Sequence, residues 1–311
     1  PVHRPDVILG GGSRHFLPMA TPGSKRKDAE DLVKEFKGLG YALSTTKSEL
    51  DATPAGTDKL LGLYQLNNMD VYIDRAALRN PQVLHGFMDQ PGLVDMTQKA
   101  IGTLSRNPNG FFLMVEGACI DKQLHTLDWQ RATYDTIEFD QAVAAAKRFA
   151  AQRDDTLIIV VADHAHGASI TGTYSEKDGQ TGREAVHTYA AAGFPTFEDR
   201  DGDGYPDNPD PEVTLAVQFA NHPDANISYR FREKPTVPAI MADGKAIANP
   251  AAEGVFSEGN IPANEDSEVH SADDILLNAM GPGSEYFNGV MDNTEVFFGM
   301  VRALGLDGLK K

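Results

Sequence analysis

The sequence predicts an α/β fold in which a mainly parallel sheet is covered by helices and is interrupted by a loop-rich insertion. Two runs are apolar throughout, which is typical of strands buried on both faces: Phe111–Val115 and Thr156–Val161. Segments with helical spacing of apolar residues separate these runs, as expected for strands joined by helical crossovers. The 311 residues are 41% hydrophobic and 23% charged, which is ordinary for a globular protein.

The first part of the chain alternates short strands with helices. A short strand at Asp6–Leu9 is stopped by three glycines, and a helix capped by Ser24 runs through Phe36 until Gly38 and Gly40 end it. A strand at Leu60–Tyr64 and a helix at Val94–Leu104 follow.

The second part contains one helix, then a stretch of different composition, and then core-like patterning again. Phe139–Ala150 is an Ala-rich helix, and from Gly167 to Val269 the apolar runs shorten while Pro, Gly and acidic residues increase. We therefore expect one α/β domain made of residues 1–166 and 270–311, with residues 167–269 inserted. Core-like patterning returns at 275–277 and 294–304, and four aromatic residues are core candidates: Phe111, Phe112, Phe297 and Phe298.

Composition excludes several classes of partner and scaffold. The net charge of −17 would repel nucleic acid and anionic membranes, so we expect neither as a main partner. The apolar run Leu157–Ala162 is too short to cross a bilayer. With Cys119 as the single cysteine, an internal disulfide is impossible.

A first group of polar residues follows the apolar run that ends at Val115. Glu116 would emerge at the carboxyl edge of the sheet, where sites in such sheets lie. Asp121 and His125 are four residues apart, hence on one face of a helical turn. An Asp and a His one turn apart suit a small borderline cation such as zinc. Taken alone, this group is equally compatible with an exposed Asp–His pair and a solvated Glu.

A second group follows the apolar run that ends at Val161. Asp163, His164 and His166 would be costly to bury at a strand end unless a metal compensated them. Because both groups should lie at the same sheet edge, together they predict a polynuclear metal site that polarises a substrate oxygen. His270 is a further candidate where the chain re-enters the sheet domain.

The predicted insertion contains an acidic loop with the spacing of a calcium site. Residues 199–210 place oxygen ligands at loop positions 1, 3, 5, 7, 9 and 12, namely Asp199, Asp201, Asp203, the Tyr205 carbonyl, Asp207 and Asp210. Gly204 stands at position 6 and Asp210 replaces the usual Glu. An ordinary solvated acidic turn is the alternative.

These motifs, in order, resemble the alkaline phosphatase family. The resemblance rests on 115–125 (VEGACIDKQLH), 156–166 with its ADHAH ending, His270, and the flanking 6–12, 61–64, 96–105 and 110–113. It covers residues 6–166 and about 269–305. It implies a three-layer sandwich, with the insertion forming a crown.

The resemblance also implies a role for each site residue. Asp121, His125 and His270 would hold one zinc ion, and Asp163 and His164 a second. Glu116 would bind magnesium, His166 would orient a zinc-bound carboxylate, and Lys122 would lie near the phosphate. The family hydrolyses phosphate monoesters through a phosphoserine. The resemblance further implies a homodimer and a periplasmic or secreted location.

One part of the family pattern is missing from these residues. The family places its serine nucleophile in an Asp-Ser-Ala segment before the first strand seen here, and no Asp-Ser-Ala occurs in this sequence. We therefore expect residues 1–311 to be the C-terminal part of a longer enzyme. The alternatives are a phosphodiesterase or sulfatase on the same scaffold, or a non-catalytic chain that binds metal or calcium.

Overall fold

The computed structural model describes residues 4–126, 128–170, 217–219, 225–226, 240–243, 245–247, 250, 255–256 and 269–306. The chain divides into two compact units. The first comprises Pro1–Ile120, Thr133–Val161 and Leu276–Lys311, and the second comprises Asp121–Ala132 and Ala162–Ile275. The predicted domain limits, 1–166 with 270–311 and 167–269, stay a prediction.

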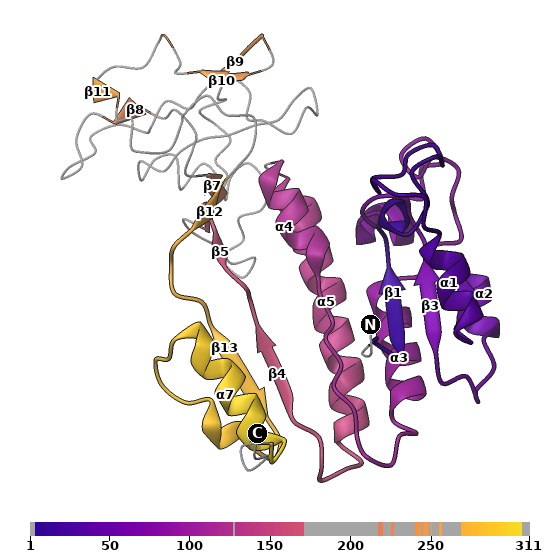
Figure 1. Ribbon diagram of the computed structural model, residues 1–311. Coiled ribbons are helices and arrows are strands. Elements are labelled where there is room, and N and C mark those ends of the chain that lie inside the picture. The colour runs from indigo at the N-terminus through magenta and orange to yellow at the C-terminus, as the bar shows by residue number, and fades with distance from the viewer. Residues whose placement is uncertain are drawn as a thin grey trace. The chain divides into compact units, whose positions relative to one another are not determined.

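The described helices and strands follow one another as the labels of Figure 1 indicate. The helices are α1 (Leu32–Gly38), α2 (Lys47–Ala52), α3 (Leu93–Leu104), α4 (Ala118–His125), α5 (Trp129–Ala150) and α7 (Asn293–Ala303), with short η1 (Ser13–His15), η2 (Asp74–Leu78) and η4 (Ser284–Tyr286). The strands of the first unit are β1 (Val7–Gly10), β2 (Ala42–Ser44), β3 (Leu60–Leu63), β4 (Ile158–Val161) and β13 (Leu277–Met280). Those of the second unit are β5 (Ala165–His166), β6 (Ala168–Ile170), β7 (Val217–Phe219), β8 (Ala225–Asn226), β9 (Ile240–Ala242), β10 (Lys245–Ile247), β11 (Val255–Phe256) and β12 (His270–Ser271).

The first unit contains a parallel sheet in the order β1-β3-β2, which confirms the α/β class. The central strand β3 is covered on both faces. Leu60 packs in a cluster with Leu50 and Met96 from α2 and α3, whereas Leu61 packs with Phe36 from α1. Since successive strand residues point to opposite faces, a strand with a core on each side must be apolar throughout.

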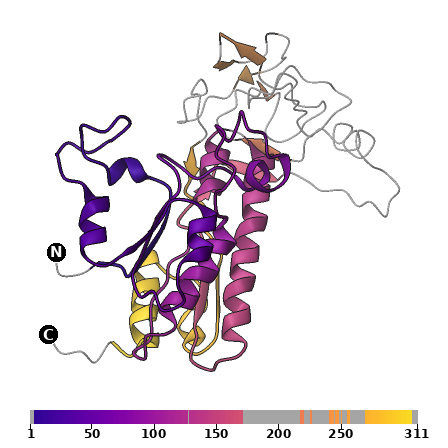
Figure 2. The same ribbon diagram turned by 90° about the vertical axis from the view of Figure 1, so that its right-hand side faces the viewer.

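A second pair of strands in the same unit, β4 and β13, is antiparallel. Helix α7 lies over this pair in Figures 1 and 2. It approaches η4 closely at Gly299, where an added Cβ would meet the Phe287 ring at 2.8 Å. Asp292 and Glu295 form a capping box at the start of α7, as expected for an acidic first turn.

Three local predictions were wrong. Residues 111–115 form no strand, because no described backbone group pairs with them. The first helix begins at Leu32 under an Asp31 cap that accepts from Lys34 N at 3.0 Å. Ser24 does not cap it, since its hydroxyl donates to the Leu17 carbonyl at 2.7 Å.

The predicted core positions were also wrong in part. Phe112, Phe297 and Phe298 are exposed, as is Leu276 within the 275–277 run. In α7 the reason is that the helix buries the face carrying Gly299, and the two phenylalanines lie outside it. Phe111 is half-buried, with its ring 6.0 Å from that of Phe149. The helix predicted at 139–150 begins earlier, at Trp129.

The second unit holds the end of α4, which continues across the unit boundary, and several two-stranded pairs. Most of residues 167–269 lie outside the described part, including the predicted calcium loop at 199–210. The crown-like insertion therefore stays a prediction. Among the helices that the structure describes, none combines the length and apolarity that a membrane span needs.

Candidate metal centre

Helix α4 supplies the first two side chains of the candidate site. Asp121 and His125 lie one turn apart, and Asp121 Oδ1 is 3.3 Å from His125 Nε2. Positions i and i+4 share a face of an α-helix, so this proximity follows directly from the sequence spacing. The predicted helical Asp–His pair is thus present in the structure.

The β5–β12 pair supplies two more histidines. His166 is the register partner of His270, and residues directly opposite in an antiparallel pair project their side chains to the same side. The pair is extended by a hydrogen bond from Gly167 N to the Val269 carbonyl at 2.9 Å. Ser271 Oγ lies 2.6 Å from Asp273 Oδ2 and 3.2 Å from the His166 carbonyl oxygen, two acceptors that share its single hydroxyl proton.

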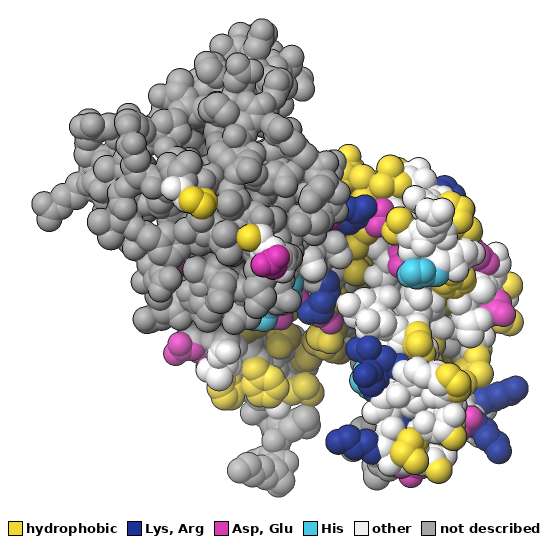
Figure 3. Space-filling view, turned by 90° about the horizontal axis from the view of Figure 1, so that it is seen from above, with side chains coloured by type: hydrophobic (Ala, Val, Ile, Leu, Met, Phe, Trp, Pro, Cys, Tyr) yellow, Lys and Arg dark blue, Asp and Glu magenta, His cyan; other side chains and the backbone are white. Residues whose placement is uncertain are grey.

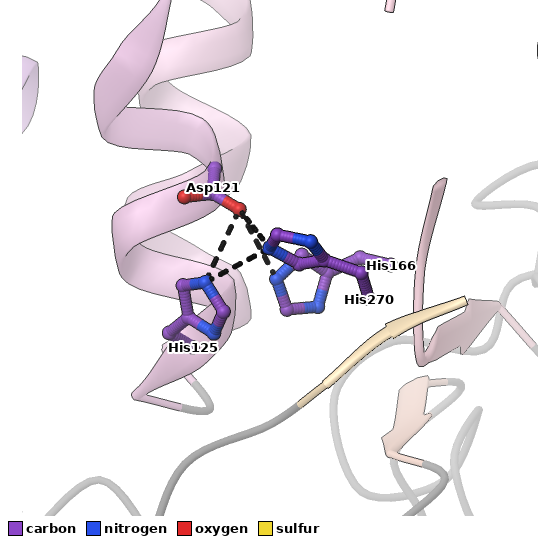
Figure 4. Close-up of side chains that lie close together, drawn as sticks. All are labelled: Asp121, His125, His166 and His270. Carbon is purple, nitrogen blue, oxygen red and sulfur yellow. Dashed lines mark hydrogen bonds and ion pairs between the residues drawn. The ribbon is translucent and has the colours of Figure 1, made fainter. Parts of the chain in front are cut away.

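These four side chains point toward one another (Figure 4). One ligand atom from each of them can be chosen so that all four lie within 4.8 Å of one another. Asp121 Oδ1 is 3.1 Å from His270 Nε2 and 3.5 Å from His166 Nε2. The Nε2 atoms of His125 and His270 are 3.1 Å apart. We call these four residues the donor group.

The electrostatics of the donor group suit a cation. Asp121 Oδ1 and both ring nitrogens of His166 are buried, and none has a hydrogen-bond partner within the described part of the chain. Burial of the His166 ring, with His125 beside it, lowers the pKa of His166 to about 4, so this imidazole is neutral near pH 7. Burial alone would raise the pKa of Asp121, but Lys122 and His125 outweigh it and the pKa lies below its usual value.

Buried oxygen and nitrogen acceptors without partners are costly unless something positive reaches them. An ionised carboxylate with three imidazoles is a donor set that zinc and similar borderline cations prefer. The residues present therefore fit a divalent metal, and its binding would satisfy the atoms that the protein leaves unpaired.

The other predicted site residues differ in their exposure and in their contacts. His164 stacks on His270 with ring centroids 3.6 Å apart, and its Nε2 is 3.8 Å from Asp121 Oδ1. Asp163 is 85% exposed at its side chain and lies 3.5 Å from His164 Nε2. Lys122 pairs with Asp121 Oδ2. Glu116 is exposed and belongs to the first unit, and its part in a metal site stays a prediction.

Sequence reasoning missed Ser271, which fastens β12 to β5. The only available signal was its position next to His270, because a hydroxyl beside a candidate ligand often forms hydrogen bonds that orient the ligand residues. The six predicted calcium ligands between Asp199 and Asp210 lie outside the described residues.

Comparison with known proteins agrees with the family resemblance found in the sequence. The family model described as "Alkaline phosphatase" matches residues 2–306. An alkaline phosphatase from Escherichia coli strain K12 is 31% identical over 97% of this chain and 53% of its own length. Alkaline phosphatase 4 from Bacillus subtilis is 32% identical over 94% of this chain and 56% of its own.

Solved structures agree at the level of the fold. Thermus thermophilus alkaline phosphatase superposes with a TM-score of 0.59 at 22% identity, covering 97% of this chain and 63% of that one. A cold-active alkaline phosphatase from Shewanella sp. gives a TM-score of 0.56 at 22% identity, covering 96% and 65%. The chain spans about half the length of the curated relatives it matches.

Proposed function

Because the chain belongs to the alkaline phosphatase family, we propose that it forms the metal-binding part of an enzyme that hydrolyses phosphate monoesters. The observation that carries this proposal is the donor group, in which a carboxylate and three imidazoles from three distant parts of the sequence converge. Phosphate monoesters are poor electrophiles, and their hydrolysis depends on charge placed beside the transferred group.

We assign the metals in the order that the family resemblance implies. Asp121, His125 and His270 would hold one zinc ion, and Asp163 with His164 a second, while Glu116 would bind magnesium. When bound, such cations polarise the ester and offset the negative charge that develops on it. The contacts among Asp121, His125 and His270 support the first assignment.

His166 we assign as a positioning residue for Asp121. Its Nε2 lies 3.5 Å from Asp121 Oδ1 with no hydrogen bond formed between them, and its lowered pKa keeps the ring neutral, so that one N–H is available to hold that carboxylate when a metal is bound. Fixing a ligand carboxylate in this way strengthens metal binding without direct contact. Lys122 pairs with Asp121 here, and its ammonium would also attract an incoming phosphate.

The nucleophile we place outside residues 1–311, in a segment that carries a serine in an Asp-Ser-Ala setting. Nearly half of the length of the relatives that match nearly all of this chain lies outside the match, which supports the presence of further catalytic parts in the family. Homodimer formation and a periplasmic or secreted location belong to the same proposal.

Residues 199–210 we propose as a calcium site that serves the insertion. Five aspartates at the ligand positions of one twelve-residue loop repel one another unless a cation binds them. The site would be structural, because it is separate in sequence from every residue of the donor group.

A metal titration tests the donor group independently of turnover. Isothermal titration of the metal-free 311-residue chain with zinc should show high-affinity binding, and His125→Ala should weaken it at least about 10-fold. His15→Ala, which removes an exposed histidine in the first unit, should leave the affinity unchanged. Equal affinities for the two variants would contradict the assignment.

Activity tests the placement of the nucleophile. Residues 1–311 alone should hydrolyse nitrophenyl phosphate barely above background, since losing a nucleophile removes several orders of magnitude of rate. The longer polypeptide should be active at alkaline pH and should be inhibited by chelators. Faster cleavage of bis-nitrophenyl phosphate or nitrophenyl sulfate would indicate a phosphodiesterase or sulfatase. Robust turnover by the purified 311-residue chain would show that the nucleophile lies within it.

A further inference from the structure

A buried ion pair lies within the first unit. Arg75 Nη2 is 2.5 Å from Glu138 Oε2, and the two side chains are only 10% and 5% exposed. Figure 3 shows Lys and Arg side chains of the described surface standing in the open, where water surrounds them. Taking two charges out of water is costly, and a buried ion pair often adds no net stability over apolar side chains of the same volume. The presence of this pair therefore points to a role in fixing geometry.

The ion pair joins three elements. Glu138 lies on α5, and its Oε1 accepts a hydrogen bond from Leu93 N, at the start of α3, at 3.0 Å. Arg75 lies on η2, and its Nε donates to the Asp70 carbonyl at 2.6 Å. Gly92 leaves the space that this arrangement needs, because an added Cβ would lie 2.5 Å from Glu138 Oε1. The pair thus ties the backbone at Asp70 to two helices at once.

The backbone of residues 69–72 is also held from other sides. Asp70 N donates to Gln90 Oε1 at 2.8 Å, and Tyr72 N donates to Asp135 Oδ2 of α5 at 3.2 Å. This stretch forms no strand, so side chains rather than a sheet ladder satisfy its backbone groups. Its position is therefore defined by the polar residues around it.

Helix α4, which carries two residues of the donor group, begins against this backbone. Cys119 Sγ donates to the Met69 carbonyl at 3.4 Å. Just before the helix, Gly117 lies so close to α5 that an added Cβ would meet the Phe139 ring at 3.2 Å. Helix α4 has only eight residues, and helices of this length are marginal in water unless other parts of the chain hold them. The first turn of α4 therefore depends on these contacts.

We propose that Arg75 and Glu138 are positioning residues for helix α4. The ion pair fixes the backbone of residues 69–72, and that backbone holds the first turn of α4. The helical turn in turn keeps Asp121 and His125 on one face. The inference concerns the same site as the proposed function and rests on it for the metal that the donor group would bind.

Charged groups fix this geometry better than apolar ones would. A guanidinium presents its donors in a rigid plane, and here Nε and Nη2 of Arg75 reach two different acceptors. Apolar side chains of similar volume would fill the space without fixing a direction, because hydrophobic attraction is non-directional. Replacing both charges by neutral groups should therefore preserve the stability of the fold and lose the positioning of α4.

The double variant Arg75→Met with Glu138→Gln tests this difference, since it removes both charges and keeps an oxygen acceptor for Leu93 N. Its melting temperature should equal or exceed that of the parent. Its affinity for zinc, measured by isothermal titration, should nevertheless fall at least about 10-fold. Arg4→Met with Glu35→Gln makes the same changes at an ion pair whose side chains are 23% and 44% exposed, and should leave the zinc affinity unchanged.

Two results of this experiment would overturn the proposal. One is an unchanged zinc affinity in the folded double variant. The other is loss of folding, which would show that the ion pair serves the fold itself. Cys119→Ala provides a second test, because it removes the contact with the Met69 carbonyl and leaves the ion pair in place. It should weaken zinc binding about 3-fold, and an affinity equal to that of the parent would also count against the proposal.

Amide hydrogen exchange of the metal-free chain separates failure of this proposal from failure of the proposed function. The amides of residues 121–125 should exchange at least about 10-fold faster in the Arg75→Met, Glu138→Gln variant, while those of β3 should stay unchanged. If the parent binds no zinc but this difference is seen, only the proposed function fails. If exchange is equal in the two chains, the proposal fails whatever metal the chain binds.

Discussion

At the scale of single residues, Asp135 on α5 is a carboxyl group buried at 5% exposure. Its Oδ2 accepts a hydrogen bond from Tyr72 N at 3.2 Å. Burial, together with the nearby Glu138 and Asp74, raises the pKa of Asp135 to about 6 against the opposing effects of the Tyr72 N–H and Arg75. Such a residue holds its neighbours in place at a cost in stability whenever it is charged.

The raised pKa of Asp135 makes the stability of the first unit depend on pH. Between pH about 4 and 6 the folded chain holds a proton that the unfolded chain has lost, so the free energy of unfolding should fall as pH rises through this window. Above pH 6 the full penalty remains. Asp135→Asn, which keeps the acceptor for Tyr72, should therefore be more stable than the parent at pH 8 by on the order of 1–3 kcal/mol.

Urea unfolding followed by circular dichroism at pH 4 and pH 8 measures this effect. Asp154→Asn, an exposed substitution shortly after α5, provides the control and should change stability by less than about 0.5 kcal/mol. If Asp135→Asn behaves like the control at both pH values, the Arg75 guanidinium must already compensate the buried charge.

At the scale of elements, the central strand β3 leaves no space at Gly62. A Cβ there would overlap the Tyr64 hydroxyl and would meet Leu9 Cδ2 at 2.7 Å. The Tyr64 hydroxyl is itself fixed by Ser44 Oγ at 2.9 Å, and both residues are buried. The glycine therefore lets strands β1 and β2 pack beside β3 around a buried tyrosine.

Gly62→Ala should destabilise the first unit by about 1–3 kcal/mol, because the extra methyl group overpacks a closed core. Gly102→Ala on α3 is the matched control. An added Cβ at Gly102 meets nothing within 4 Å, and alanine favours helix, so this variant should gain up to about 1 kcal/mol. Thermal unfolding of both variants measures the difference, and equal melting temperatures would contradict the packing argument.

Elements also show where sequence reasoning succeeds and where it stops. The Asp121–His125 pair could be predicted because four-residue spacing fixes a shared helix face without any other contact. The pairing of β5 with β12 could not, since two-residue strands have no periodicity and this register joins distant parts of the chain. Re-entry of the chain into the sheet domain made His270 a candidate, and the family resemblance assigned it to the same zinc ion as Asp121 and His125.

Predictions that depend on competition between local partners were the weakest. Ser24 and Asp31 are both of a residue type that caps helices well. Asp31 caps this helix, whereas the Ser24 hydroxyl donates its hydrogen bond to the Leu17 carbonyl. The apolar composition of Phe111–Val115 indicated a strand, but a strand needs a ladder partner, which composition cannot supply.

At the scale of the whole molecule, the chain consists of two units, and the donor group lies entirely in the second. The proposed calcium loop also belongs to the second unit in sequence. A calcium-selective chelator should therefore increase amide exchange within residues 167–269 and leave the exchange of β1, β3 and α3 unchanged, because the calcium ligands are all local. Magnesium at equal concentration should not restore the protection.

Differential scanning calorimetry with and without the chelator gives a second measurement. A bound cation stabilises the folded form in proportion to its affinity and concentration, so its removal should lower the melting temperature of one transition. An unchanged thermogram would favour the ordinary acidic turn.

The β5–β12 pair has a consequence for how this protein can change over evolutionary time. His166 and His270 are held together by backbone pairing, so the two ends of the chain between them meet at this pair. The entropy of closing such a loop grows with the logarithm of its length, and a tenfold change in length costs only about 2 kcal/mol. Descendants could therefore shorten, lengthen or exchange this whole segment for an unrelated module while the two imidazoles stayed in register.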